Sequence, residues 1–427
     1  MRNVDVNREY KSSCLAEVAL PICIAGYQDN KLVDVEGNSY IDFTSGYGVA
    51  NTGWDRKELI EIATNQLQKL NYSPPWFPTK EAVELATLLK KITGNNFAKC
   101  ARAIGGTEAN EIINRSSYIY NEKPATLSLY HSYHGGSKFA VNLSDNKNFR
   151  FPPTSTKNKY YKIPPPYCYR CPLNKTKDTC DVECTSFIET SLKTHPDIGI
   201  FFIEPVIGSG GVIVIPEKYL RRAKEICNSH SVTYAFDEVI TGFGRLGAVT
   251  AMELYDIVPD AVAFAKGMGA GIVPIGAALL NENLSEAYSK YEDVSGTFAW
   301  TPLACAVSKA NIDLLLKEKL PEKAMIKGKY LLEQLNLMFH KYLPDNTGEI
   351  RGVGMLIGIE LVYNHTEKKP FIRLIQRLSL GLVRNGLMIC ESWNFEIILI
   401  CPPLNISSGQ IETALKIIEN ELKKLAQ

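Results

Sequence analysis

Two apolar runs in the middle of the chain each end at a charged residue, and this arrangement constrains the fold more than any other feature. The run Thr233–Phe236 ends at Asp237, and the run Ala261–Ala265 ends at Lys266 before a glycine-rich turn. Short apolar runs of this kind are typical of strands buried inside a parallel sheet. In open α/β sheets, ligands bind outside the carboxyl ends of such strands. The sequence therefore predicts an α/β core with Asp237 and Lys266 at one ligand site.

A lysine and an aspartate at such a site indicate a particular cofactor. Lys266 can form a Schiff base with an aldehyde, and Asp237 can pair with a pyridinium nitrogen and keep it protonated. Pyridoxal 5'-phosphate carries both groups, and its protonated ring accepts electrons from the bond that is broken. The pair therefore suggests an enzyme that uses pyridoxal phosphate.

The chain before Asp237 alternates apolar and amphipathic segments. Apolar runs at Ile198–Pro205 and Val232–Val239 flank the amphipathic stretch Lys218–His230. Within that stretch, apolar residues recur at the spacing of a helix at Leu220, Ala223, Ile226 and Cys227. A strand, a helix and a second parallel strand form a right-handed crossover. The pattern predicts a doubly wound α/β core.

After Pro302 the pattern changes to long helical stretches with fewer strands. We expect helices at 303–317, 321–342 and 408–425, and strands at 355–361 and 397–401. Such a mixture indicates a second, smaller α+β lobe.

The composition favours a small-molecule enzyme over a nucleic-acid or membrane protein. The chain has 427 residues, of which 45% are hydrophobic and 22% charged, and its formal net charge is +1. A nearly neutral chain lacks the basic face that nucleic-acid binding needs. The longest apolar stretch, Ala261–Leu280, contains Lys266, four glycines and Pro274, so it cannot be a membrane span.

The N-terminal residues and the cysteines favour a cytoplasmic location. Residues 15–26 follow basic residues and resemble a signal peptide, but Glu17 and Pro21 interrupt the apolar run. The eleven cysteines are odd in number and spread over the whole length, which fits reduced thiols better than a disulfide framework.

An ordered set of motifs carries a resemblance to a known family. The set is VDVEGNSYIDFTSGYGVANTG (33–53), GGTEAN (105–110), YHGGS (133–137), IEPVIGSGG (203–211), YAFDEVITGFGRLG (234–247), AFAKGMGAG (263–271), GTFAWTP (296–302), RGVGMLIGIEL (351–361) and CPPL (401–404). In this order, the motifs resemble those of class III aminotransferases. These are pyridoxal-phosphate enzymes of fold type I that include ornithine, 4-aminobutyrate and ω-amine transaminases.

The resemblance implies a fold, a reaction and an assembly. It implies a large cofactor-binding domain at 51–310 with a mainly parallel sheet, and a smaller α+β domain built from residues 1–50 and 311–427. The activity would be transfer of an amino group from an amine or amino acid donor to an aldehyde or keto acceptor, by a ping-pong mechanism. Lys266 would be the base that moves the proton. The active sites would lie at the interface of a homodimer.

The motif GGTEAN predicts the phosphate site. Gly106 leaves backbone amides unobstructed where we expect a helix to begin near Glu108, and Thr107 adds a hydroxyl. Taken alone, the motif could be an ordinary glycine turn with Thr107 as the N-cap. The family usually has serine where this chain has Gly105, which removes one hydroxyl contact.

The resemblance assigns further cofactor contacts. Tyr133 would lie flat against the cofactor ring, and Val239 would pack on the opposite face, because it lies two residues after Asp237 and a strand has a period of two. Glu238 would then face away as a structural carboxylate. Thr297 would bind the phosphate of the neighbouring subunit's cofactor, although Trp300 and Thr301 depart from the family's usual residues before the proline.

Two positions depart from the family in a way that bears on the substrate. Leu399 occupies the place where many relatives carry an arginine that clamps a carboxylate. Ser209 stands where the ornithine and 4-aminobutyrate enzymes have a glutamate that pairs with that arginine. We therefore expect an amine, an ω-amino compound or a specialised carbonyl compound as the substrate.

A cysteine-rich insert near 164–187 also departs from the family. Cys168, Cys171, Cys180 and Cys184 have the spacing C-x2-C-x8-C-x3-C. Four thiolates could bind a structural zinc ion, but two disulfides or free thiols are equally simple interpretations, and we predict no metal in the reaction.

Other readings of the same residues stay open. An amino-acid racemase or epimerase, or an aminomutase, of this fold would use the same lysine, aspartate and phosphate site. A non-catalytic protein could also keep the fold, although Lys266 and Asp237 argue against it. Trp76 and Phe77 could line the substrate entrance or pack between lobes.

Overall fold

The computed structural model describes residues 3, 5, 22–145, 159–176, 179–290, 296–392 and 396–427. The run at 15–26 that resembles a signal peptide lies largely outside these residues. No helix in the described ranges is long and apolar enough to span a membrane.

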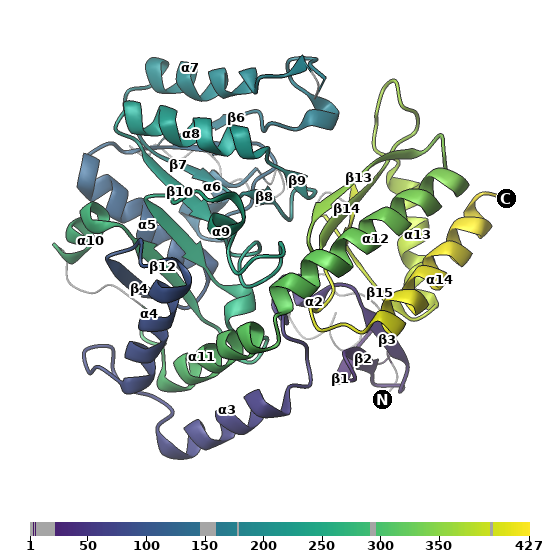
Figure 1. The fold of residues 1–427 in the computed structure, drawn as a ribbon, viewed down its shortest axis with the longest axis horizontal. Coiled ribbons are helices and arrows are strands. Elements are labelled where there is room, and N and C mark those ends of the chain that lie inside the picture. Colours follow the sequence, from purple (N-terminus) through teal and green to yellow (C-terminus); the bar gives the residue numbers. More distant parts are fainter. Residues whose placement is uncertain are drawn as a thin grey trace.

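A seven-stranded sheet forms the centre of the larger part of the molecule (Figure 1). Its strands lie in the order β4 (Lys99–Ala103), β12 (Gly276–Leu280), β11 (Ala261–Phe264), β10 (Thr233–Asp237), β7 (Ile198–Ile203), β5 (Ala125–Leu129) and β6 (Tyr160–Ile163). The five strands from β11 to β6 pair in parallel, whereas β12 runs antiparallel to both of its neighbours. The sheet is therefore mainly parallel, as expected.

Helices cover both faces of this sheet. Phe201 of β7 packs in the same apolar cluster as Leu220 of α8 (Glu217–Ser229). The next residue, Phe202, packs with Ile112 of α5 (Gly106–Asn121) on the other face. A strand buried on both sides needs apolar residues throughout, which explains the uninterrupted run in the sequence. The remaining helices of this part are α3 (Lys57–Lys69), α4 (Lys80–Ile92), α6 (Lys138–Leu143), α7 (Ser186–Thr194), α9 (Ala251–Tyr255), α10 (Glu282–Ser289) and α11 (Pro302–Lys317).

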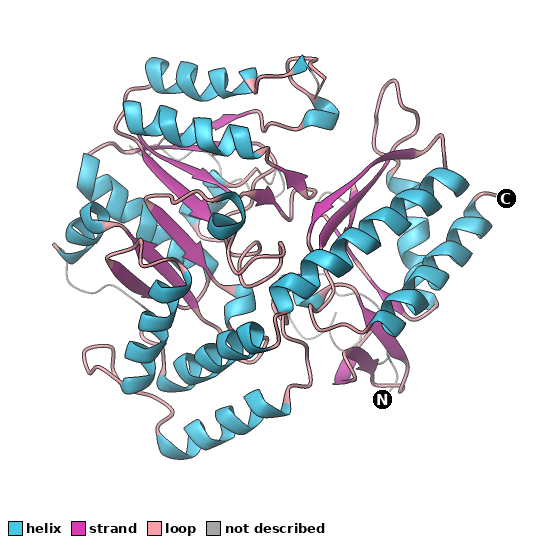
Figure 2. Cartoon of the chain, in the orientation of Figure 1, coloured by secondary structure: helices cyan, strands magenta, loops and turns pink. Residues whose placement is uncertain are grey.

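The C-terminal part contains a second group of sheets and helices (Figure 2). One four-stranded sheet has the order β13 (Thr347–Val353), β14 (Leu356–Leu361), β17 (Ile397–Ile400), β16 (Cys390–Glu391), and it lies near α12 (Leu320–Tyr342), α13 (Ile372–Arg384) and α14 (Ser408–Leu425). The other has the order β1 (Ile24–Gln28), β2 (Lys31–Asp34), β3 (Ser39–Asp42), β15 (Leu387–Met388). Because β15 pairs in parallel with β3, the N-terminal segment joins the C-terminal one.

Two short elements remain. The helix α2 (Ser45–Gly48) lies between β3 and α3, and β8 (Val206–Ile207) and β9 (Ile213–Val214) form an antiparallel hairpin whose second strand contacts β13. The insert follows β6 and contains two short 3-10 helices at Cys168–Arg170 and Glu183–Thr185.

Most expected elements form within two residues of their predicted ends. The helix expected near Glu108 begins at Gly106, with the extended Gly105 at the N-cap position. One detail differs. The strand before Glu238 ends at Asp237, so Val239 lies in a turn and not on the strand. The period-two argument for Val239 was therefore wrong.

Candidate active site

A pocket opens where several strands of the large sheet end. Asp237 ends β10 and Lys266 follows β11, while Glu204 follows β7 and Tyr133 lies beyond β5. All four line a cavity of about 330 Å³, together with the N-terminal end of α5. The topology thus brings together residues that are far apart in the sequence, at the carboxyl edge of the sheet where α/β enzymes bind ligands.

Asp237 is a buried carboxylate held by three donors. The side chain is 3% exposed. Its Oδ2 accepts a hydrogen bond from Asn110 Nδ2 at 2.8 Å and lies 2.8 Å from His134 Nδ1, and its Oδ1 accepts the Val239 backbone N–H at 3.0 Å. Charge-assisted hydrogen bonds of this kind fix a carboxylate in one orientation.

Lys266 stands at a strained position of the backbone. Its φ is 43°, in the left-handed region that residues other than glycine rarely adopt. Such strain is typical of functional sites. Burial lowers the pKa of the Lys266 ammonium, while Glu204 and Asp237 act in the opposite direction. The amine can therefore lose its proton more readily than an exposed lysine.

Glu204 is a second buried carboxyl group in the cavity wall and is 4% exposed. It accepts the backbone N–H of Tyr133 at 3.0 Å through one oxygen and that of Gly208 at 3.1 Å through the other. Burial raises the pKa of Glu204 to about 7, with Asp237 adding to the increase and His134 opposing it.

The N-terminal end of α5 forms a tightly packed cradle. A Cβ on Gly106 would lie 2.6 Å from a methyl group of Val239, so the Val239 side chain leaves room for glycine but not for a larger residue at this position. Gly135 packs against Thr107 in the same way, and Gly136 donates its N–H to the Thr107 hydroxyl at 3.3 Å. The 16-residue helix α5 begins here, and the first backbone N–H groups of a helix have no partner within it, so they are available to an anion.

Six of the seven predicted site residues line this cavity. These are Gly106, Thr107, Tyr133, Asp237, Val239 and Lys266. The seventh, Thr297, is exposed on a turn outside the cavity lining of this chain. Glu238 points away and accepts the N–H groups of Ala251 and Met252 at the start of α9.

The residues predicted to bear on the substrate fall in two places. Ser209 lines the cavity. Leu399 is fully buried in an apolar cluster and does not line it.

The cysteines of the insert lie away from the cavity. Cys171, Cys180 and Cys184 are free thiols, and the Cys168 thiol lies 3.8 Å from the Pro166 carbonyl oxygen. Among the residues that the structure describes, no three potential metal ligands lie close enough to hold an ion.

The sequence did not single out Asn110, His134 or Glu204 as site residues. Each lies inside a motif that was recognised for other reasons, namely GGTEAN, YHGGS and IEPV. Each of these three residues is a polar residue within an otherwise apolar or glycine-rich stretch next to a predicted strand, and this pattern could have identified them.

The residues of the cavity fit pyridoxal phosphate. In the described part of the chain, His134 Nε2 and Asn110 Oδ1 are buried and lack a hydrogen-bond partner, which is unusual unless a further group belongs there. The buried carboxylate suits a pyridinium nitrogen, the lysine suits an aldehyde, and the start of α5 suits a phosphate.

Comparisons with known proteins agree with this site. The family model "Aminotransferase class-III" matches residues 15–422. The chain is 30% identical to the adenosylmethionine-8-amino-7-oxononanoate aminotransferase of Geobacter sulfurreducens, over 95% of this chain and 93% of that protein. The crystal structure of a Bacillus anthracis aminotransferase superposes with a TM-score of 0.90 at 28% identity and covers 98% of both chains.

A third similarity concerns the cofactor. An amine transaminase from an uncultivated Pseudomonas species, solved in its pyridoxal-phosphate-bound form, has a TM-score of 0.89 at 26% identity and covers 96% of this chain and 98% of its own. Together with the cavity residues, these matches show that the chain belongs to the class III aminotransferases, has fold type I and is a pyridoxal-phosphate-dependent aminotransferase.

Proposed function

We propose that Lys266 and Asp237 carry the reaction of this aminotransferase, with an amine or ω-amino compound as the donor. The observation that supports this assignment is that Lys266, with its strained backbone, and Asp237, with three hydrogen-bonding partners, line one cavity. Pyridoxal phosphate supplies an aldehyde that reacts with amines and a protonated ring that accepts electrons.

Asp237 would pair with the ring nitrogen of the cofactor. Asn110 and His134 hold Oδ2, and the Val239 N–H holds Oδ1, so the carboxylate cannot turn away. Tyr133 and Val239 form walls of the cavity, and the Glu204 carboxylate fixes the Tyr133 backbone.

Lys266 transfers the proton. Burial lowers the pKa of its ammonium, so Nζ gives up its proton more readily than an exposed lysine does and can accept it again. Gly106 and Thr107, at the start of α5, would hold the phosphate through backbone N–H groups and the Thr107 hydroxyl.

A homodimer would complete the site. The turn that carries Thr297 is fastened beside the start of α5, because Glu108 accepts the N–H groups of Gly296 at 2.8 Å and Ile104 at 2.6 Å. The next residue, Phe298, is 67% exposed, and Trp76 and Phe77 are 75% and 60% exposed. Exposed aromatic groups are typical of protein interfaces, and a second copy would cover them. Thr297 would then reach the phosphate in the partner's site.

The charges of the cavity favour an amine donor. Lys266 is the one Lys or Arg side chain among the described residues that line it, while Glu204 and Asp237 are acidic. Among the described residues that line the cavity, no arginine is available to clamp a carboxylate, and Leu399 is buried in an apolar cluster.

Two coarser assignments accompany this proposal. The division into a large domain at 51–310 and a small domain from 1–50 and 311–427 is supported by the pairing of β3 with β15. A cytoplasmic location is supported by the free thiols of Cys171, Cys180 and Cys184.

The test is the change in absorbance of the holoenzyme on adding single donors without an acceptor. Simple amines and ω-amino compounds should convert the cofactor from its aldehyde to its amine form, and glutamate should do so poorly. Glutamate and 2-oxoglutarate as the best substrate pair in steady-state assays would contradict the donor assignment. Loss of chirality of an amino acid without net conversion would favour a racemase.

A further inference from the structure

A glycine-rich turn forms the side of the pocket that carries Ser209. The turn Gly208–Gly211 joins β8 to β9, and Ser209 is its one residue with a side chain. Gly210 packs against the His131 carbonyl so closely that a Cβ would overlap it, and Gly211 has a φ of 122°. Because the turn has little side-chain packing of its own, its neighbours must hold it in place.

Arg351 of β13 holds the far end of this turn. Its Nη2 donates to the Gly211 carbonyl at 2.5 Å and its Nε to the Val212 carbonyl at 2.9 Å. The side chain is 9% exposed, and its third nitrogen, Nη1, pairs with Glu360 of β14 at 2.8 Å and with Glu349 at 3.2 Å. Glu360 therefore sets the orientation of the guanidinium that holds the turn.

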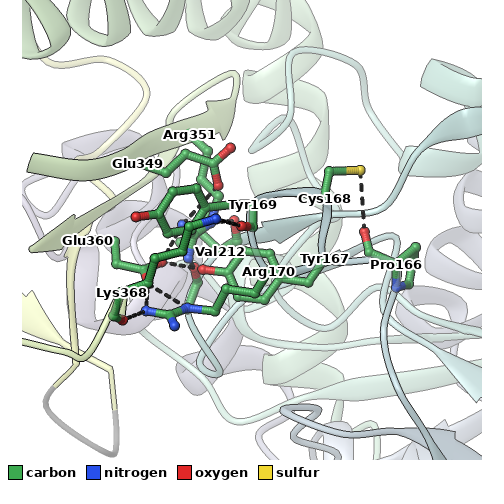
Figure 3. Close-up of polar contacts among 11 residues, drawn as sticks. Pro166, Tyr167, Cys168, Tyr169, Arg170, Val212, Glu349, Arg351, Glu360 and Lys368 are labelled. Carbon is green, nitrogen blue, oxygen red and sulfur yellow. Dashed lines mark hydrogen bonds and ion pairs between the residues drawn. The ribbon is translucent and has the colours of Figure 1, made fainter. Parts of the chain in front are cut away.

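The insert supplies two side chains to this ion pair (Figure 3). Arg170 donates through Nε to Glu360 at 2.8 Å and through Nη2 to the Lys368 carbonyl. The Tyr167 hydroxyl donates to the other Glu360 oxygen, and the Arg351 guanidinium lies 4.7 Å from the Tyr167 ring centre. Burial raises the pKa of the Tyr167 phenol, so the hydroxyl stays a donor at ordinary pH.

Tyr167 also supports the second neighbour of the turn. Its ring meets the His131 ring edge to face, with centres 6.4 Å apart. The His131 carbonyl is the group against which Gly210 packs. The buried Tyr167 side chain therefore contacts both Arg351 and His131, the two residues that hold the turn.

We propose that Tyr167 and Arg170 of the cysteine-rich insert are positioning residues for the Ser209 side of the pocket, acting through Arg351, Glu360 and His131. The insert is then part of the substrate site's support and not a peripheral loop. This inference rests on the proposed function only for its effect on substrate, because its structural part concerns the turn alone.

Two variants and two matched controls test the proposal in the holoenzyme. Tyr167→Phe removes one hydroxyl from Glu360, and Arg170→Ala removes the insert's cation. Tyr342→Phe removes a hydroxyl that donates to Glu419, and Arg221→Ala removes a guanidinium bonded to Glu217 and two carbonyls. Neither residue lines the cavity. The two insert variants should raise the KM for the amino donor about threefold to tenfold, the effect of one ordinary hydrogen bond. The cofactor absorbance and the controls should not change.

Hydrogen–deuterium exchange of the peptide that spans the turn gives a readout without any reaction. The Gly208, Gly211 and Val212 amides are hydrogen-bonded in the intact turn, so the insert variants should speed their exchange and the controls should not. Unchanged exchange and unchanged KM in both insert variants would overturn the proposal. If the insert variants exchange faster but the wild-type protein transfers no amino group, the positioning role of Tyr167 and Arg170 is supported and the proposed function is contradicted.

Discussion

At the scale of single residues, two buried carboxyl groups in one cavity play different parts. The two oxygens of Asp237 are held by Asn110, His134 and the Val239 backbone N–H. Glu204 has two backbone N–H donors but lies close to Asp237, and burial raises its pKa to about 7. Environments that differ in this way give paired carboxyl groups separate roles.

Glu204 makes stability depend on pH in a defined direction. Between its ordinary pKa of 4.5 and the value of about 7, the folded protein keeps a proton that the unfolded chain has released. The free energy of unfolding should therefore fall as the pH rises through this window. In Glu204→Gln the dependence should be weaker, by up to about 1.4 kcal/mol per pH unit. Urea unfolding of the apoprotein between about pH 5 and pH 7 measures it.

Glu286→Gln, which changes an exposed carboxyl group on α10, is the control and should keep the wild-type slope. An equal slope in Glu204→Gln and wild type would show that the Glu204 carboxyl group is ionised in the folded protein throughout this range.

At the scale of elements, the start of α5 must approach the turn after β10 very closely. Gly105 and Gly106 are adjacent, yet only Gly106 faces Val239, and a Cβ on Gly105 would meet nothing within 4 Å. Replacing each glycine in turn by alanine therefore separates the effect of contact with Val239 from the effect of losing a glycine at this point in the chain. This close approach places the helix N-terminus and Asp237 at the same cavity.

Gly106→Ala should destabilise the apoprotein by about 1–3 kcal/mol, because the new methyl group overlaps the Val239 side chain. Gly105→Ala should change stability little, since Gly105 is extended and its surroundings are open. Combining Gly106→Ala with Val239→Ala should recover part of the loss, which urea unfolding of the four proteins measures as a coupling energy. Additive effects of the two substitutions would mean that the two residues do not meet.

At the scale of the whole molecule, the exposed aromatic side chains of Phe298, Trp76 and Phe77 predict an obligatory dimer. Phe298→Asp or Trp76→Asp places a charge where a second copy would bury an aromatic ring. Light scattering should then give about half the wild-type mass, with loss of most activity and retention of the folded state. Leu337→Asp on α12 changes an exposed apolar residue elsewhere, 66% exposed, and should keep the dimer. A wild-type protein that is already monomeric and active would contradict the shared site.

The sequence predicted elements better than it predicted contacts. Strands such as β7 and helices such as α8 follow from local patterns, and so does the position of Asp237 at a strand end. The partners of Asp237 do not, because Asn110 lies 127 residues away and His134 lies 103 residues away. Their meeting depends on the order of strands in the sheet, which no local pattern records.

The insert shows the same limit. Its cysteine spacing suggested a metal site. In the structure, Tyr167 and Arg170 of the insert bind Glu360, which lies 193 residues after Tyr167 and 190 residues after Arg170. Nothing near Tyr167 in the sequence indicates a buried carboxylate as its partner. Val239 lines the cavity as expected, but it lies in a turn and not on the strand, because β10 ends two residues earlier at Asp237.

The most direct measurement is the visible absorbance of the purified holoenzyme after addition of an amine donor with no acceptor, alongside Lys266→Ala. The wild-type protein should convert the cofactor to its amine form. Lys266→Ala should convert it roughly 100- to 10,000-fold more slowly, because it lacks the general base. Conversion by Lys266→Ala at the wild-type rate, or a wild-type protein that binds no pyridoxal phosphate, would contradict the role assigned to this lysine.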